Sequence, residues 1–174
     1  MLKKSDLSVL IDEPTLQARI GELAAQISRN YANSDLAVVG ILKGSFVFLS
    51  DLTRKLDIDC TIDFLGLSSY GDSTTSSGVV KITSDLTRPI ADRDVLVVED
   101  IIDTGLTMRY LLDNLQTRKP ASVRVCTLLH KPANARCEVP IDYTGFTIED
   151  QFVIGYGLDY AERFRNLPYI AYKP

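Results

Sequence analysis

Apolar residues near the start of the chain are spaced as on one face of a helix. They recur at every third or fourth position from residue 16 to residue 27, and Pro14 stands just ahead of them, where the first turn of a helix accepts proline. The pattern therefore predicts a helix with a single buried face. The residues on that face are Leu16, Ile20, Leu23, Ala24 and Ile27.

Three short runs of continuous apolar residues follow, at positions 36–42, 94–99 and 122–129. Continuous apolar runs are typical of strands that are covered on both faces, as in a parallel sheet. Residues 60–65 alternate enough to form a further strand, and residues 79–82 are expected to lie in a strand pair that flanks the polar stretch between them. The sequence thus predicts a sheet of several buried strands.

Helices are predicted between these strands. Residues 46–55 form one, with Phe46, Leu49 and Leu52 (or Phe48 as an alternative) turned inward. Strand, helix and strand joined by short links are the signature of βαβ units, so the predicted fold is α/β with an open, mainly parallel twisted sheet. No repeat or linker interrupts the chain. A second helix is marked by Met108, Leu111, Leu112 and Leu115.

The composition excludes several classes of protein. Of the 174 residues, 45% are hydrophobic and 24% are charged, no apolar run approaches the length of a membrane-spanning helix, and the first residues lack the apolar stretch of a secretory signal. A cytoplasmic protein without membrane contact is expected. The net charge of −4 argues against a surface that coats nucleic acid. Three cysteines without a CxxC pair argue against a disulfide framework and a zinc site, and Cys126 is expected to be a buried thiol.

The segment from Val97 to Thr107, VVEDIIDTGLT, joins an apolar strand to a helix through a short polar loop. Ligands of open α/β sheets bind at the carboxyl ends of strands, where this loop lies. Gly105 lets the backbone come close to a ligand, and Thr104 and Thr107 supply hydroxyl donors. The helix that follows presents free N–H groups and the positive end of its dipole. Together these features predict a cradle for one phosphate.

Three acidic residues accompany this cradle. Glu99 and Asp100 are acceptors for ribose hydroxyls and hard oxygen ligands for Mg²⁺, so they indicate a vicinal diol, a divalent cation or both. Asp103 lies inside the loop, where negative charge beside a phosphate is unfavourable unless it takes part in chemistry. Any one of these acids alone would be interpreted as a helix cap or a solvated residue. The string contains neither GxxxxGK[ST] nor GxGxxG, which excludes a Walker loop and a dinucleotide fingerprint.

Four other segments accompany the central motif. They are Leu42-Lys43-Gly44-Ser45, the polar stretch 68–78, His130-Lys131-Pro132, and residues 150–165, which begin DQFVIGYGLDY. With these segments, the motif closely resembles the phosphoribosyl pyrophosphate signature of type I phosphoribosyltransferases, and more narrowly their bacterial hypoxanthine (or hypoxanthine-guanine) branch. The resemblance runs from about residue 36 to the C-terminus.

The resemblance implies an architecture. Residues 1–174 are expected to form a single phosphoribosyltransferase domain of the type I fold, in which helices cover both faces of the sheet. A small hood, built mainly from residues 131–174 with an N-terminal part, is expected to bind the base. The polar stretch 68–78 is expected to be a flexible lid that includes Ser69 and Tyr70.

The resemblance also assigns residues to parts of the substrates. The phosphoribosyl group and its 5′-phosphate are assigned to Glu99, Asp100, Asp103, Thr104, Gly105, Leu106 and Thr107. Pyrophosphate is assigned to Lys43, Gly44 and Arg165, with a cis peptide inferred between Lys43 and Gly44. The purine is assigned to Lys131, Phe152, Val153 and Asp159. Mg²⁺ is assigned to Glu99, Asp100 and Asp159.

The implied activity is purine salvage. A 6-oxopurine base, hypoxanthine or guanine, would react with phosphoribosyl pyrophosphate, and Asp103 would be the general base at purine N7. Leu106 departs from the pattern, because relatives often carry a polar or basic side chain there. A xanthine-preferring enzyme and a nucleotide-sensing regulatory protein on the same fold remain alternatives. A homodimer or homotetramer is expected, with no nucleic acid bound.

Overall fold

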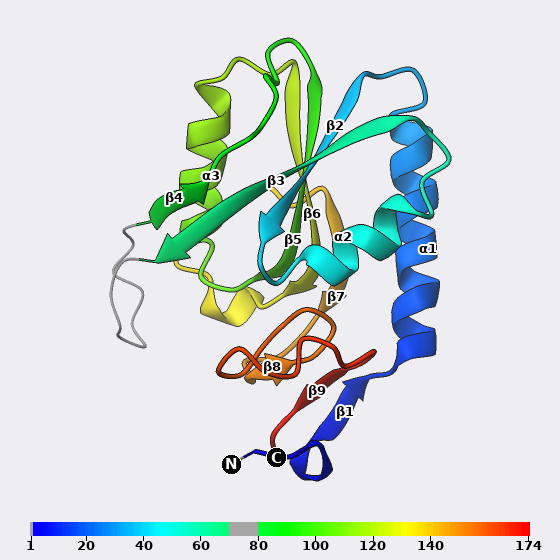
Figure 1. Ribbon diagram of the computed structural model, residues 1–174, viewed down its shortest axis with the longest axis vertical. Coiled ribbons are helices and arrows are strands. Elements are labelled where there is room, and N and C mark those ends of the chain that lie inside the picture. The colour runs from blue at the N-terminus through cyan, green and yellow to red at the C-terminus, as the bar shows by residue number, and fades with distance from the viewer. Residues whose placement is uncertain (1, 70–79) are drawn as a thin grey trace.

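The computed structural model describes residues 2–69 and 80–174. Its main sheet has six strands in the order β4-β3-β2-β5-β6-β7 (Figure 1). All neighbouring strands are parallel except β3 and β4, which are antiparallel. The strands are β2 (Leu36–Leu42), β3 (Cys60–Ser69), β4 (Val80–Ser84), β5 (Asp94–Ile102), β6 (Ser122–His130) and β7 (Tyr143–Thr147).

Helices cover both faces of this sheet, because successive residues of its central strands point to opposite sides. Leu36 and Val38 of β2 pack in one core with α1 (Glu13–Asn30) and α2 (Phe46–Thr53). Ala37 and Val39 pack in a second core with α3 (Leu106–Gln116). The central strands are therefore buried on both faces, which explains why their sequences are continuous apolar runs.

Both termini contribute to a second, smaller sheet, which we call the hood. It is antiparallel with the order β1-β9-β8, and it lies below the main sheet in Figure 1. Its strands are β1 (Ser8–Ile11), β8 (Val153–Ile154) and β9 (Ile170–Tyr172). Short 3-10 turns at Lys4–Asp6 and Pro132–Asn134 complete the elements. The hood thus joins residues from opposite ends of the chain.

The predicted helical face near the N-terminus is confirmed in full, since all five of its apolar residues are buried in α1. Pro14 lies in the first turn, and the side chain of Asp12 caps the helix by accepting a hydrogen bond from the backbone N–H of Thr15 at 3.0 Å. The apolar face of α3 is confirmed as well. Among the described residues, none of the helices is long and apolar enough to cross a bilayer.

The interpretation of α2 was partly wrong. Phe48, Leu49 and Leu52 are buried, whereas the side chain of Phe46 is 44% exposed. A helix turns about 100° per residue, so positions 48, 49 and 52 share one face and position 46 falls outside it. The helix also ends at Thr53, two residues before the predicted end.

Strand β3 extends beyond its predicted end at residue 65 to Ser69, where it pairs with β4. Ser69, which was assigned to the lid, is therefore the last residue of a strand. Tyr70 and the rest of the predicted lid up to residue 78 lie outside the described residues. The expected strand pair around this stretch is confirmed by the antiparallel register of β3 and β4.

Candidate active site

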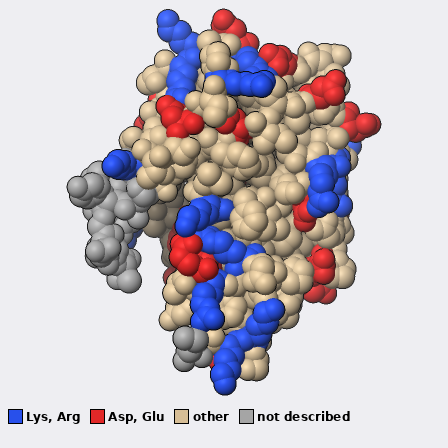
Figure 2. Space-filling model, viewed as in Figure 1, with Lys and Arg blue, Asp and Glu red and all other residues tan. Residues whose placement is uncertain are grey.

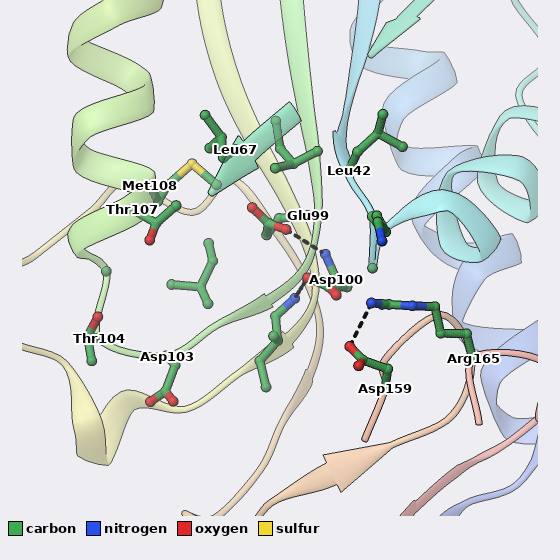
Figure 3. A pocket seen from close by; sticks show the side chains of 16 residues that line it. Leu42, Leu67, Glu99, Asp100, Asp103, Thr104, Thr107, Met108, Asp159 and Arg165 are labelled. Atoms are coloured by element: carbon green, nitrogen blue, oxygen red, sulfur yellow. Dashed lines mark hydrogen bonds and ion pairs between the residues drawn. The ribbon is translucent and has the colours of Figure 1, made fainter. Parts of the chain in front are cut away.

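A cavity of about 360 Å³ lies at the carboxyl ends of β2 and β5, as the motif at residues 97–107 predicted (Figure 3). It is lined mainly by three segments, the end of β2, the β5–α3 connection and the hood, together with Leu67 of β3. Chemically active residues from all three meet there. They are Lys43, Gly44, Glu99, Asp100, Asp103, Thr104, Gly105, Thr107, Asp159 and Arg165.

The β5–α3 connection forms the predicted anion cradle. Gly105 is the N-cap of α3, with a φ of 80°, and without a side chain it supplies no capping hydrogen bond to the first turn of that helix. The N–H groups of the first turn therefore remain available to an anion, and the helix dipole favours negative charge there. The structure gives a further reason for glycine here, because a Cβ at Gly105 would lie 2.8 Å from the backbone oxygen of Cys137.

Glu99 and Asp100 are adjacent carboxyl groups, of which Glu99 is buried and Asp100 half-buried. Burial and the neighbouring Asp100 raise the pKa of Glu99, and burial also raises the pKa of Asp100. The Glu99 side chain is oriented by the backbone N–H of Asp100 at 3.3 Å, and that of Asp100 by the N–H of Ile101 at 2.8 Å. Such a pair is stabilised by a cation or by hydroxyl donors brought by a ligand.

Gly44 brings the end of β2 into direct contact with this acidic pair. A Cβ at position 44 would lie 1.5 Å from Oδ2 of Asp100, so any other residue would force Asp100 or the loop to move. The backbone oxygen of Gly44 in turn lies 2.0 Å from the position that a Cβ on Gly157 of the hood would take. The inferred cis peptide between Lys43 and Gly44 is wrong by one residue, because the cis bond joins Leu42 and Lys43.

Arg165 enters the cavity from the hood, and Figure 3 shows its guanidinium group beside Asp159. Its Nη2 lies 2.8 Å from Oδ1 of Asp159, and its Nη1 donates to the backbone oxygen of Gly157 at 2.8 Å. Its Nε is buried and has no hydrogen-bond partner among the described residues. A buried guanidinium donor without an acceptor indicates that an anion completes this site.

Asp103 is a second cavity residue with an unsatisfied polar atom. Its Oδ1 is buried and has no partner within the described part of the chain. Buried polar atoms of folded proteins are almost always hydrogen-bonded, so an exception in a cavity indicates an atom that meets a ligand. Figure 3 shows the Asp103 side chain on the loop that leads to Thr104, below the acidic pair.

Lys131 is buried, with a relative exposure of 6%, which is unusual for a lysine without a close partner. Its backbone N–H donates to the oxygen of Ile102, a residue of the cavity lining, at 2.9 Å. Its Nζ lies 3.7 Å from Oδ1 of Asp150, which Asn134 also contacts at 2.7 Å. A buried ammonium with one distant counter-ion retains donors for a further acceptor.

Of the four residues assigned to the purine, Asp159 lines the 360 Å³ cavity, whereas Lys131, Phe152 and Val153 do not. Phe152 is 63% exposed and packs edge-on against Tyr160, with ring centroids 6.0 Å apart. It borders a second, apolar cavity of about 910 Å³ on the hood. Val153 is buried in β8. Leu106, the first residue of α3, is also absent from the lining.

The carboxylates of the site are not arranged as a ready-made metal centre. Across residues 2–69 and 80–174, no group of three or more His, Cys, Asp or Glu side chains is placed to hold a metal ion. Glu99 and Asp100 supply two adjacent oxygen ligands, whereas Asp159 is engaged by Arg165. One or two carboxylates are what Mg²⁺ uses when substrate phosphates and water complete its shell, so the residues fit an ion that arrives with its substrate.

Sequence reasoning missed the acidic partners of the basic residues. Asp150 accompanies Lys131, and Glu162 contacts both Lys43, at 3.0 Å, and Arg165, at 3.3 Å. Both acids lie within the quoted segment 150–165, but isolated surface acids carry no signal of their partners. The three cysteines are free, and Cys126 is buried as predicted.

Comparison with known proteins agrees with this geometry. The phosphoribosyl transferase domain family matches residues 8–161. The chain is 50% identical to a hypoxanthine-guanine phosphoribosyltransferase of Mycobacterium avium, over 94% of this chain and 83% of that one. It is 48% identical to a hypoxanthine phosphoribosyltransferase of Haemophilus influenzae, over 97% and 96%.

Solved structures give the same result. A hypoxanthine phosphoribosyltransferase from Staphylococcus aureus superimposes with a TM-score of 0.94 at 44% identity, covering 98% of this chain and 93% of that one. The predicted resemblance is thereby confirmed together with the predicted fold, a mainly parallel sheet with helices on both faces and a small hood. This chain belongs to the phosphoribosyltransferase family, in its type I, bacterial hypoxanthine-guanine branch.

Proposed function

We propose that this protein transfers the phosphoribosyl group of phosphoribosyl pyrophosphate to hypoxanthine or guanine, forming IMP or GMP and releasing pyrophosphate. The observation that carries the proposal is the burial of Lys131 directly behind the lining of the phosphoribosyl cavity. An ammonium group only donates hydrogen bonds. It can therefore donate to the O6 atom of a 6-oxopurine, which is an acceptor, and it disfavours the amino group of adenine, which is itself a donor.

The phosphoribosyl donor would span the cavity. Its 5′-phosphate would bind the free N–H groups at the start of α3, beside Thr104 and Thr107, and its ribose hydroxyls would donate to Glu99 and Asp100. The pyrophosphate would face Lys43, Gly44 and the unpartnered Nε of Arg165. This arrangement uses each of the three chain segments that meet in the cavity.

The reaction would be a substitution at the anomeric carbon of the ribose. Purine N9 forms a bond to that carbon as the bond to the pyrophosphate oxygen breaks, and the proton on N7 passes to Asp103. The buried, unpartnered Oδ1 of Asp103 is the acceptor for that proton. Arg165 and Lys43 stabilise the negative charge that develops on the leaving group.

Magnesium and the base complete the proposed site. Mg²⁺ held by Glu99 and Asp100 would neutralise part of the pyrophosphate charge, with Asp159 available near a second position once Arg165 turns to the substrate. Phe152 is exposed enough to stack on a purine, and the backbone of Val153 borders it. We also expect a homodimer or homotetramer, because α2 and β3 leave Phe46, Ile62 and Phe64 exposed.

The direct test supplies hypoxanthine, guanine, xanthine and adenine one at a time with phosphoribosyl pyrophosphate and Mg²⁺, and follows monophosphate formation. We expect turnover of hypoxanthine, guanine or both, with adenine inert. Preferential turnover of xanthine would move the assignment to another base. Binding of the donor without product from any base would leave the fold intact and contradict the proposed reaction.

A further inference from the structure

The carboxylate of Glu162 forms ion pairs with Lys43 and Arg165, the two cations to which the proposed function assigns pyrophosphate. Oε2 of Glu162 accepts a hydrogen bond from Lys43 Nζ at 3.0 Å, and Oε1 accepts one from Arg165 Nη2 at 3.3 Å. Lys43 follows β2 and Arg165 belongs to the hood, so one side chain links two distant segments. In the space-filling view, basic side chains gather over the lower half of the molecule, around and below the junction with the hood, with an acidic group among them (Figure 2).

The backbone holds Glu162 in an unfavourable conformation. Tyr160 and Arg163 exchange backbone hydrogen bonds of 3.0 and 3.1 Å, so Ala161 and Glu162 form a two-residue hairpin. Both have positive φ, 51° and 61°. Hairpins of this kind usually carry Asn-Gly or Gly-Gly, because residues with a Cβ are disfavoured there. A glutamate at such a position indicates that its side chain has a use that outweighs the strain.

The carboxylate is ionised and easily displaced. The hydrogen bond from Lys43, followed by the charges of Lys43 and Arg165, lowers the pKa of Glu162. The side chains of Glu162 and Lys43 are both 67% exposed, and exposed ion pairs are weak. Arg165 meanwhile keeps one buried donor, Nε, without a partner, so Glu162 satisfies the cations only in part.

We propose that Glu162 is an internal substitute for pyrophosphate, a carboxylate that pairs Lys43 with Arg165 in the empty site and must leave before a diphosphate binds. The inference rests on the proposed function, which identifies these cations as the pyrophosphate site. Glu162 is therefore a competitor that weakens the binding of pyrophosphate and of phosphoribosyl pyrophosphate. The same competition favours release of the product, because the returning Glu162 carboxylate displaces pyrophosphate from Lys43 and Arg165.

The test is calorimetric titration of the protein with inorganic pyrophosphate in the presence of Mg²⁺. We expect Glu162→Gln to lower the Kd about two- to tenfold, as the loss of two weak, competing ion pairs predicts. Glu22→Gln is the matched control. Glu22 also forms an (i, i+3) ion pair with an arginine, and its side chain is 65% exposed, but the pair lies on α1. Its Kd should equal that of the wild type. Glu162→Gly, which also relieves the strained φ, should tighten binding and raise stability.

Three outcomes would overturn the inference. A higher Kd in Glu162→Gln would show that Glu162 positions the cations for the ligand, and an unchanged Kd would show that the contact has no influence. Failure of the wild type to bind pyrophosphate would show that Lys43 and Arg165 form no such site. Because binding is measured without turnover, a protein that binds pyrophosphate but converts no base would contradict the proposed function alone.

Discussion

At the scale of single residues, Asp103 combines a buried oxygen without a partner and a position inside an anion cradle. If Asp103 accepts the purine proton, Asp103→Asn removes the base while keeping the shape of the side chain. We expect turnover to fall about 10²- to 10⁴-fold, the usual contribution of a general base, while the Kd for phosphoribosyl pyrophosphate stays unchanged. Single-turnover kinetics with a separate binding titration would measure both. Unchanged turnover would remove Asp103 from the chemistry.

Lys131 supports a prediction about the base. If Lys131 donates to the purine as proposed, Lys131→Ala should raise the KM for hypoxanthine or guanine more than the KM for phosphoribosyl pyrophosphate, because the lost donor would face the base and not the phosphates. Asp150→Asn, which keeps the lysine but removes its counter-ion at 3.7 Å, should have a smaller effect in the same direction. Steady-state kinetics with each substrate varied in turn provides the measurement. An equal rise in both KM values would contradict a base-reading role.

The sequence predicted the identities of these residues but not their surroundings. Asp103 and Glu99 stand in one continuous motif, whose local spacing suffices to place them. The burial of Lys131 depends on residues 102 and 150, which only the folded sheet and hood bring to it. The pairing of Glu162 with Lys43 was unpredictable for the same reason: 119 positions separate them in the chain.

At the scale of the elements, the close contact between the end of β2 and the acidic pair gives a sharp prediction. Gly44→Ala places a methyl group on the Asp100 carboxylate, so Asp100 or the loop must move. We expect binding of phosphoribosyl pyrophosphate with Mg²⁺ to weaken at least tenfold, about 1.4 kcal/mol. Calorimetric titration with the donor measures this. Unaltered affinity would show that the loop adapts without cost.

Gly21→Ala is the control for that substitution. Gly21 lies inside α1, and a Cβ there meets no atom within 4 Å. Alanine should therefore raise the free energy of unfolding by about 0.5–1 kcal/mol, because glycine is a poor residue in a helix interior, and leave donor binding unchanged. Urea denaturation and the same titration test both statements.

The elements that the sequence predicted best are those whose burial is local to them. Strand β2 was predicted with its observed bounds, and β5 and β6 with their observed starts, because continuous apolar runs require cover on both faces. Strands β1, β7, β8 and β9 were not predicted as strands. β1 is four residues long and is defined by pairing with β9, at the other end of the chain, and β7 is an edge strand of five residues within an irregular stretch.

At the scale of the whole molecule, a partly buried polar cluster links the hood segment to helices α1 and α2. Tyr156, in the hood segment, donates a hydrogen bond to Asp51 of α2, and Gln17 of α1 donates to the same carboxylate at 2.6 Å. We expect Tyr156→Phe to lower the free energy of unfolding by about 1.5–3 kcal/mol, the range for a hydrogen bond to a charged group. Urea denaturation measures it. Tyr110→Phe, at a partly exposed tyrosine of α3, should stay within about 0.5 kcal/mol of the wild type.

The same cluster predicts a dependence on pH. Burial alone would raise the pKa of Asp51, but hydrogen bonds from Tyr156, Gln17 and Arg54 bring it below its ordinary value of 3.8. A carboxyl group whose pKa is lowered by folding stabilises the fold above 3.8, and this contribution is lost as the pH falls through the folded-state pKa. Tyr156→Phe should therefore lose less stability than the wild type between neutral pH and pH values below 3.8. Parallel losses would exclude Asp51 as the titrating group.

The pairing of β1 with β9 has a consequence for the order in which the protein becomes competent. A chain leaves the ribosome N-terminus first, so β2, β5, β6 and the helices between them can assemble before residues 170–172 exist. Strand β1 can pair only after β9 has been made, some 160 positions later in the chain. Closing so long a loop also costs conformational entropy. A nascent chain would thus form the β5–α3 connection early and the hood last.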